Sequence, residues 1–270
     1  MQAIVDFHTH AFPDPLAERA VGYLLEEGRR KYEINAYLDG RVSSLLASMD
    51  RNDIEKSVIC SIATKPGQFD PILSWSKEIA SDRIIPFPSI HPEDPRAADR
   101  VSQIREAGLR GIKFHPYYQD FDLDEKRLFP VYERIEREGL IVVMHTGYDL
   151  AFERVKKADP EKIVRVMEAF PSLKLVTTHL GAWEDWEEVE RHIAGKKIFM
   201  EVSFSLDCAD RDTARRIIMS HPEDHVLFGT DSPWADQGEA IRLLHGLELG
   251  QDLERRILRE NGLKLLASVR

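Results

Sequence analysis

Residues 111–147 read GIKFHPYYQDFDLDEKRLFPVYERIEREGLIVVMHTG, and the fold prediction starts from this stretch. Residues 111–116 and 141–147 are short, apolar and rich in β-branched side chains, as buried strands are. Residues 122–139 carry apolar side chains at helical spacing and end at Gly139, a common helix terminator. Parallel strands need a crossover of a dozen or more residues, so this stretch predicts a parallel βαβ unit.

The same alternation continues along the whole chain. Eight strand-like runs are found at residues 3–10, 56–62, 84–90, 111–116, 141–147, 174–181, 198–204 and 226–234. Eight βα units in 270 residues match a closed (β/α)8 barrel, so an α/β fold is predicted, a TIM barrel formed by one domain over residues 1–270. A doubly wound open sheet is the alternative, but no GxGxxG loop follows any strand.

The first connection, residues 12–56, is longer than an ordinary loop. Residues 16–32 and 41–53 have helical patterns, which predicts a helical insertion after strand one that caps the barrel mouth. Arg29, Arg30 and Lys31 in this connection could attract an anionic substrate, although a solvated helix face is the stronger interpretation.

Composition limits the classes of partner. The formal charge of −10 disfavours nucleic acid, which needs clustered Lys and Arg, and a small-molecule substrate is expected. No apolar stretch approaches the roughly 20 residues that span a membrane, and a signal-peptide pattern is missing, so a cytoplasmic protein is predicted. Cys60 and Cys208 are expected to be reduced thiols, and a homodimer is left open.

Histidines concentrate at the ends of the predicted strands. In DFHTH, residues 6–10, side chains two apart share a strand face, so His8 and His10 point the same way. Six of the ten histidines fall at strand ends, namely His8, His10, His91, His115, His145 and His179. In a barrel these ends surround one pocket, where several imidazoles and the carboxylate of Asp231 would suit zinc or another divalent metal.

Four motifs then carry a resemblance to a known family. DFHTH, MHTG (144–147), THLG (178–181) and GTDSPW (229–234), in this order, resemble the amidohydrolase superfamily of metal-dependent barrel enzymes. Residues 44–59, SLLASMDRNDIEKSVI, together with GIKFHP, are most similar to the amidohydrolase-related branch, which includes aminocarboxymuconate semialdehyde decarboxylase-like enzymes.

The resemblance implies a role for each motif residue. His8, His10, His145 and Asp231 would be ligands of one divalent metal, with zinc expected and manganese or iron as alternatives. Asp231 would also handle the proton of the attacking water. His179 would donate a hydrogen bond to the substrate oxygen where negative charge develops, or else serve as the ligand of a second metal.

Three further residues keep open roles. Lys113 could be a carboxylated bridge between two metals, as in binuclear members of the superfamily, but an ion pair with Asp6 or Glu201, or a contact with a substrate carboxylate, is favoured over it. His115 could bind substrate or orient a ligand. Glu201 could fix a histidine tautomer beside the metal, or form a salt bridge inside the barrel.

The function that follows is a metal-dependent hydrolase that opens a small amide, ester or lactone with metal-activated water. A non-oxidative decarboxylase of a small unsaturated or aromatic acid would use the same residues and is the alternative. A barrel that only binds small molecules is a third hypothesis, which the complete set of predicted ligands disfavours.

Overall fold

Residues 111–147 form the predicted βαβ unit. Strand β4 (Gly111–Phe114) and strand β5 (Ile141–Met144) pair in parallel, with helix α5 (Phe129–Glu138) between them. Val131, Tyr132 and Ile135 form the buried face of α5, as their spacing predicts. The helix ends at Gly139, whose φ of 67° lies in the left-handed region that glycine adopts without strain.

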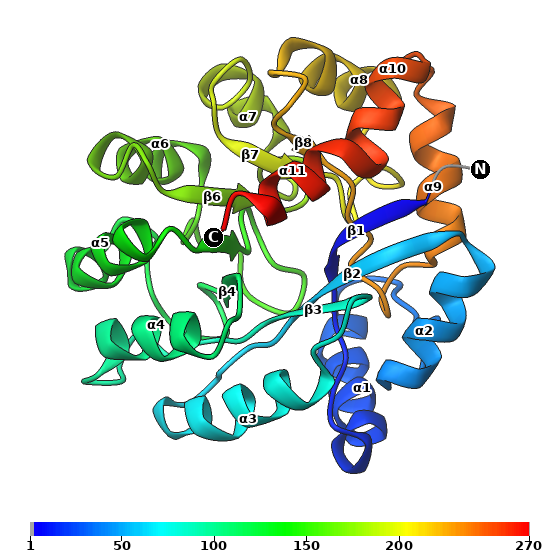
Figure 1. The fold of residues 1–270 in the computed structure, drawn as a ribbon. Helices are drawn as coiled ribbons and strands as arrows, with labels where there is room; N and C mark the ends of the chain where they lie inside the picture. The colour runs from blue at the N-terminus through cyan, green and yellow to red at the C-terminus, as the bar shows by residue number, and fades with distance from the viewer. Residues whose placement is uncertain (1–2, 270) are drawn as a thin grey trace.

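The computed structural model describes residues 3–269, and its strands form a closed parallel barrel (Figure 1). One sheet has the order β1-β2-β3 and the other β4-β5-β6-β7-β8. Bridges between Ser89 and Lys113 and between Thr9 and Ser232 join the two sheets at both seams. The predicted (β/α)8 barrel is therefore confirmed. The remaining strands are β1 (Ile4–Thr9), β2 (Ile54–Cys60), β3 (Ile84–Phe87), β6 (Lys174–Thr177), β7 (Phe199–Glu201) and β8 (Val226–Leu227).

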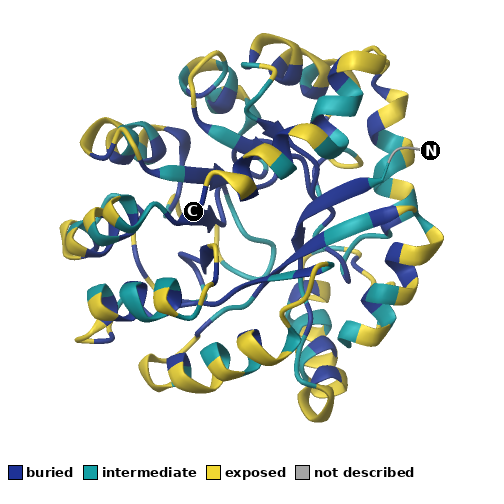
Figure 2. Ribbon diagram, viewed as in Figure 1, coloured by how far each residue is buried: buried dark blue, intermediate teal, exposed yellow. Residues whose placement is uncertain are grey.

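Helices surround the strands, with their buried residues turned inward and their exposed residues outward (Figure 2). The segment between β1 and β2 holds α1 (Asp14–Arg29) and α2 (Val42–Arg51). The other α-helices are α3 (Phe69–Ile79), α4 (Ala97–Glu106), α6 (Pro160–Ala169), α7 (Trp186–His192), α8 (Arg211–Ser220), α9 (Gln237–Gly246), α10 (Gln251–Arg255) and α11 (Asn261–Ala267). Over residues 3–269, no helix combines the length and the apolar composition that crossing a membrane requires.

Several strands are shorter than the apolar runs that predicted them. β6 stops at Thr177 and β8 at Leu227, although the runs continue to residues 181 and 234. Beyond these strands the chain turns at His179 and Asp231, whose φ values of 58° and 65° lie in the left-handed region. These turns place the two side chains at the carboxyl-terminal edge of the barrel, just beyond the strands.

Candidate metal centre

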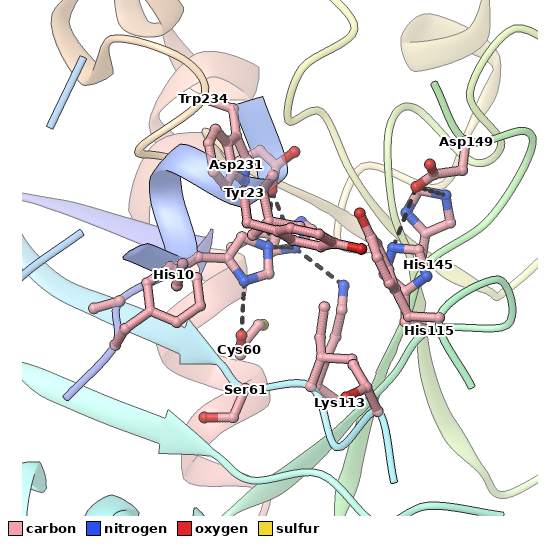
Figure 3. A pocket seen from close by; sticks show the side chains of 18 of the residues that line it. His10, Tyr23, Cys60, Ser61, Lys113, His115, His145, Asp149, Asp231 and Trp234 are labelled. Atoms are coloured by element: carbon pink, nitrogen blue, oxygen red, sulfur yellow. Dashed lines mark hydrogen bonds and ion pairs between the residues drawn. The ribbon is translucent and has the colours of Figure 1, made fainter. Parts of the chain in front are cut away.

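A cavity of about 610 Å³ opens at the carboxyl-terminal edge of the strands (Figure 3). This volume is within the range of small-molecule sites. The structure brings seven of the eight predicted site residues to its lining: His8, His10, Lys113, His115, His145, His179 and Asp231. The eighth, Glu201, is fully buried and contacts His8 from the other side.

His8 and His10 point their Nε2 atoms at each other from β1 and the residue after it. The two Nε2 atoms are 3.2 Å apart. Asp231 Oδ1 lies 3.0 Å from His10 Nε2 and 3.5 Å from His8 Nε2. The Nδ1 of His10 donates a hydrogen bond to the carbonyl oxygen of Cys60 at 2.7 Å. In its neutral form His10 therefore presents a lone pair at Nε2, toward another nitrogen and a carboxylate.

Glu201 fixes the tautomer of His8. Its carboxylate lies 2.9 Å from His8 Nδ1, and its two oxygens also accept hydrogen bonds from the backbone N–H groups of His179 and Ser203. Burial raises the pKa of Glu201 to about 8, while the bonds from Ser203 oppose that rise. An ionised Glu201 can only accept hydrogen bonds, so in that state His8 Nδ1 supplies the hydrogen and His8 Nε2 carries a lone pair.

A second pair of facing nitrogens belongs to His145 and His179. The Nδ1 of His145 lies 3.1 Å from the Nε2 of His179. The other nitrogen of each ring donates to a backbone carbonyl, that of Tyr148 for His145 and that of Ser203 for His179, both at 3.0 Å. The neutral rings therefore direct two lone pairs at each other.

This donor set fits a divalent cation. Acceptor atoms that converge within 3.0–3.5 Å repel one another unless a positive charge lies among them. Imidazole nitrogen and carboxylate oxygen are the donors that zinc and other borderline divalent metals take. The predicted four ligands are nevertheless divided, because His145 clusters with His115 and Asp149, and not with His8, His10 and Asp231.

Burial sets the charge of these groups. It is the main cause that lowers the pKa of His8, His145 and His179 below the ordinary value, with the nearby Lys113 adding to the effect. Burial alone would raise the pKa of Asp231, but the contact with His10 and the neighbouring positive charges bring it below the ordinary value. Neutral imidazoles and an ionised carboxylate are the forms that bind metals.

Lys113 reaches the histidines with its side chain, while its backbone pairs with Val143, two residues before His145 on the neighbouring strand. Its Nζ is 3.0 Å from His8 Nε2, at the point where the lone pairs of the first group converge. Within residues 3–269 it forms no ion pair with Asp6 or Glu201 at salt-bridge distance. Asp6 instead accepts hydrogen bonds from Thr230 and Gln237. Lys113 is a cation inside the candidate site, on strand β4.

Asp149 is the residue that sequence reasoning missed. Its Oδ2 lies 3.4 Å from His115 Nε2 and 3.6 Å from His145 Nε2, and it lines the cavity. His115 stacks on His145 with ring centroids 4.0 Å apart, so it supports a candidate ligand from the side. The signal was present in HTGYD, residues 145–149, where a carboxylate follows a strand-end histidine by four residues.

Comparisons with solved structures agree with the barrel. A TIM-barrel protein of Bordetella bronchiseptica superposes with a TM-score of 0.78 at 21% identity, covering 99% of both chains. A 5-carboxyvanillate decarboxylase of Sphingomonas paucimobilis superposes with a TM-score of 0.69 at 15% identity, again over 99% of both chains. A protein of Pseudomonas putida described as a candidate 2-pyrone-4,6-dicarboxylic acid hydrolase has a TM-score of 0.69 at 16% identity, over 99% of this chain and 98% of its own.

Sequence comparison identifies the family. A dihydroorotase of Helicobacter pylori is 27% identical over 176 residues, which are 59% of this chain and 51% of that protein. The chain thus spans about half the length of the curated relatives it matches. The family model for amidohydrolases matches residues 5–267, almost the whole chain. The motifs that carried the resemblance lie inside this match, and the chain belongs to the amidohydrolase family.

Proposed function

We propose that this protein is a metal-dependent hydrolase that cleaves an ester, lactone or amide of a small molecule. The observation that carries the proposal is the convergence of His8 Nε2, His10 Nε2 and Asp231 Oδ1 within 3.5 Å on the floor of a substrate-sized cavity. A divalent cation, with zinc expected, would supply Lewis acidity there, polarising the scissile carbonyl and acidifying water.

Asp231 is the proposed base. Its carboxylate is ionised, and it lies on the cavity floor beside both imidazoles of the first group. In hydrolysis, the oxygen of water forms a bond to the carbonyl carbon while Asp231 accepts the proton. The bond from that carbon to the leaving oxygen or nitrogen then breaks, and the proton passes from Asp231 to the leaving group. Asp231 is restored as a carboxylate, ready for the next cycle.

The structure changes the role proposed for His179. Its only ring hydrogen in the neutral form is used by the carbonyl of Ser203, so the ring offers a lone pair and no hydrogen to a substrate oxygen. We therefore favour His179 as a ligand that acts with His145, over the hydrogen-bond donor expected from the resemblance. The His145–His179 pair would complete the single metal centre or hold a second ion, and the number of ions per chain distinguishes these arrangements.

Decarboxylation is the second candidate, and Lys113 is the observation that favours it. Among the cavity-lining residues of the described chain, Lys113 is the single lysine or arginine. A fixed cation at the cavity floor could hold the carboxylate of an acid substrate beside the metal ligands. In that reaction the bond from the ring or alkene carbon to the carboxylate carbon breaks, carbon dioxide leaves, and a proton replaces it on the carbon.

The deciding experiment combines metal content with product analysis. Protein purified without added metal is measured by elemental analysis, next to Asp231→Asn and the control His245→Asn, which changes a histidine far from the cavity. The proposal expects one or two divalent ions per chain, fewer in Asp231→Asn, and an unchanged content in the control. Wild-type protein without any metal after reconstitution would refute the proposal.

Products are then followed in water enriched in oxygen-18. A hydrolase places the heavy oxygen in the released carboxylate, whereas a decarboxylase releases carbon dioxide from an acid substrate and leaves the remaining carboxylates unlabelled. Simple lactones and aryl esters are the test substrates for the first reaction, and hydroxybenzoates for the second. Asp231→Asn should lower kcat by about 100-fold or more, the size of a general acid–base contribution.

A further inference from the structure

The cavity has a polar floor and a mostly apolar wall, in which Ser61, Thr64 and Gln68 are uncharged polar members. The histidines, the two aspartates and Lys113 lie together at the ends of the barrel strands, as Figure 3 shows for His10, Lys113, His145 and Asp231. Farther out, α1 contributes four residues at positions i, i+4, i+7 and i+8, which lie on one helical face: Leu16, Ala20, Tyr23 and Leu24. Helix α3 adds Ile72 and Trp75 to the wall.

Two of these wall residues are large, apolar and accessible. Leu16 is 43% exposed and Tyr23 59% exposed, although both belong to a helix whose opposite residues Ala17 and Val21 are buried. The same cavity connects them to the candidate metal ligands. An exposed apolar surface that continues from a reactive site is typical of a surface that a ligand covers.

In the described part of the chain, the wall of the cavity carries no charged side chain, and all charged lining residues belong to the floor. Within residues 3–269, the acids that line the cavity are Asp149 and Asp231, both at the strand ends, and the single lining cation is Lys113. Arg29 and Lys31, which follow the lining face of α1, are held by backbone oxygens of Ile34 and Phe152 and do not line the cavity. A charged group on the outer part of a substrate would meet no opposite charge among the described residues that line the wall, so any hydration that it lost there would be a net cost.

We propose that the substrate is neutral outside its reactive group and carries an alkyl or aryl arm, which lies between α1 and the Ile72–Trp75 face of α3. This inference rests on the proposed hydrolase and names its substrate class as hydrophobic esters, lactones or amides. This substrate class replaces the anionic substrate that Arg29, Arg30 and Lys31 could have attracted. It also separates this site from one built for a dicarboxylic acid.

A matched pair of esters tests the inference. The 4-nitrophenyl ester of hexanoic acid and the mono-4-nitrophenyl ester of adipic acid share one chain length and differ in a terminal methyl or carboxylate. The hexanoate should have kcat/KM higher by about 10- to 100-fold, because the adipate buries an unpaired charge. Leu16→Arg should reduce or reverse this ratio by supplying a partner for the carboxylate, while Met219→Arg, an equally exposed apolar residue on α8, should leave it unchanged.

A binding measurement keeps the inference separate from the proposed reaction. Three of the four tryptophans, Trp75, Trp183 and Trp234, line the cavity, so tryptophan fluorescence reports occupancy. The uncleavable probes are 2-decanone and 9-oxodecanoate, which again differ by a terminal carboxylate. Tighter binding of the ketone than of the oxo acid, with weaker ketone binding in Trp75→Ala, supports the apolar arm. If neither ester is cleaved, this binding result still stands and only the proposed hydrolase activity is refuted. Equal or tighter binding of the oxo acid, or preferred turnover of the adipate ester, overturns the inference while hydrolysis itself still stands.

Discussion

Three histidines on the cavity floor are each oriented by one ring nitrogen that donates a hydrogen bond to a backbone carbonyl. Cys60, Tyr148 and Ser203 supply backbone carbonyls for His10, His145 and His179. A carbonyl oxygen only accepts hydrogen bonds, so these partners fix the neutral tautomers and leave the inner nitrogens free to bind a cation. The donor set is thus prepared by the fold before any ion arrives, which reduces the cost of ordering it on binding.

Lys113 gives a prediction at this scale. Its ammonium group lies 3.0 Å from His8 Nε2, and a metal ion would have to share that space with it. We expect Lys113→Met to bind zinc at least about tenfold more tightly, because two neighbouring cations repel each other by more than about 1 kcal/mol in a buried site. Competition with a chromophoric chelator measures the affinity, and Lys113→Arg, which keeps the charge, is the control. Loss of metal in Lys113→Met would instead identify a carboxylated lysine that bridges two ions.

His221 gives a second residue-scale prediction, remote from the cavity. It is 3% exposed, donates a hydrogen bond to the carbonyl of Ile198 at 2.7 Å, and burial lowers its pKa to about 4. The unfolded chain takes up this proton below about pH 6.5, whereas the folded chain does so only near pH 4. Stability from this residue is therefore complete above pH 6.5 and falls by roughly 2–3 kcal/mol as the pH drops to 4.

Urea unfolding of wild type and His221→Gln tests this direction of the change in stability with pH. Glutamine keeps a donor but does not titrate, so the stability difference between the two proteins should shift in favour of the variant on going from pH 7 to pH 4.5. A difference that is constant over this range would show that His221 does not titrate between the folded and unfolded states.

Residue identities were predictable from the sequence, but their hydrogen bonds were not. His8, His10 and Asp231 could be found because strand periodicity and motif order are local properties of the chain. We favour a ligand role for His179 because its hydrogen goes to the carbonyl of Ser203, 24 residues away. Such a partner is set by tertiary geometry and leaves no trace in the residue type, since every residue has a carbonyl.

At the scale of elements, the close approach of the segment after β8 to Glu201 and His8 depends on Gly229. A Cβ atom there would lie 2.4 Å from Glu201 Oε2 and 3.1 Å from His8 Cβ, both in the buried interior. Gly229→Ala should therefore push Glu201 from its place, weaken the orientation of His8, and cost about 1–3 kcal/mol of folding stability. Metal affinity should fall as well, by about tenfold, the usual effect of losing a partner that orients a ligand.

Thermal melting and zinc titration of Gly229→Ala check both effects. Gly246→Ala is the matched control, because a Cβ atom at the end of α9 meets nothing within 4 Å. That variant should be as stable as wild type or slightly more stable. Wild-type metal affinity in Gly229→Ala would contradict the proposed link from β8 through Glu201 to His8.

Element types were predicted better than element ends. The strands β4 and β5 and the helix between them follow directly from apolar periodicity, and Gly139 marks the helix end. Positive φ angles follow β6 and β8, at His179 and Asp231. Asp and His adopt this conformation more often than most residue types, but the sequence alone does not say which of them do. The strained turns occur at candidate functional residues, where local strain is commonly found.

At the scale of the whole molecule, the cavity floor is assembled from distant parts of the chain. His8 and His10 come from the sheet β1-β2-β3, while His145, His179 and Asp231 follow strands of the sheet β4-β5-β6-β7-β8. The eightfold βα alternation was enough to predict that these positions meet, because barrel closure brings all strand ends to one edge. The apolar wall was not predictable, since it depends on how α1 lies across the cavity, and no periodic pattern encodes that position.

The origin of the ligands in two sheets leads to a prediction for metal removal. An ion held by β1 and by the segment after β8 joins the first and last strands of the barrel, so it binds the folded chain and not the unfolded one. At a zinc concentration about 1,000-fold above Kd, this linkage would add about 4 kcal/mol of stability, or roughly 8–16 °C in Tm for a chain of this size. Calorimetry with and without a chelator measures the shift. The double variant His10→Asn/Asp231→Asn should melt at one temperature in both conditions, because the first donor group is gone, whereas His245→Asn should keep the full shift. A chelator effect that persists in the double variant would mean that the stabilising ion is held elsewhere, with His145 and His179 as the next pair to test.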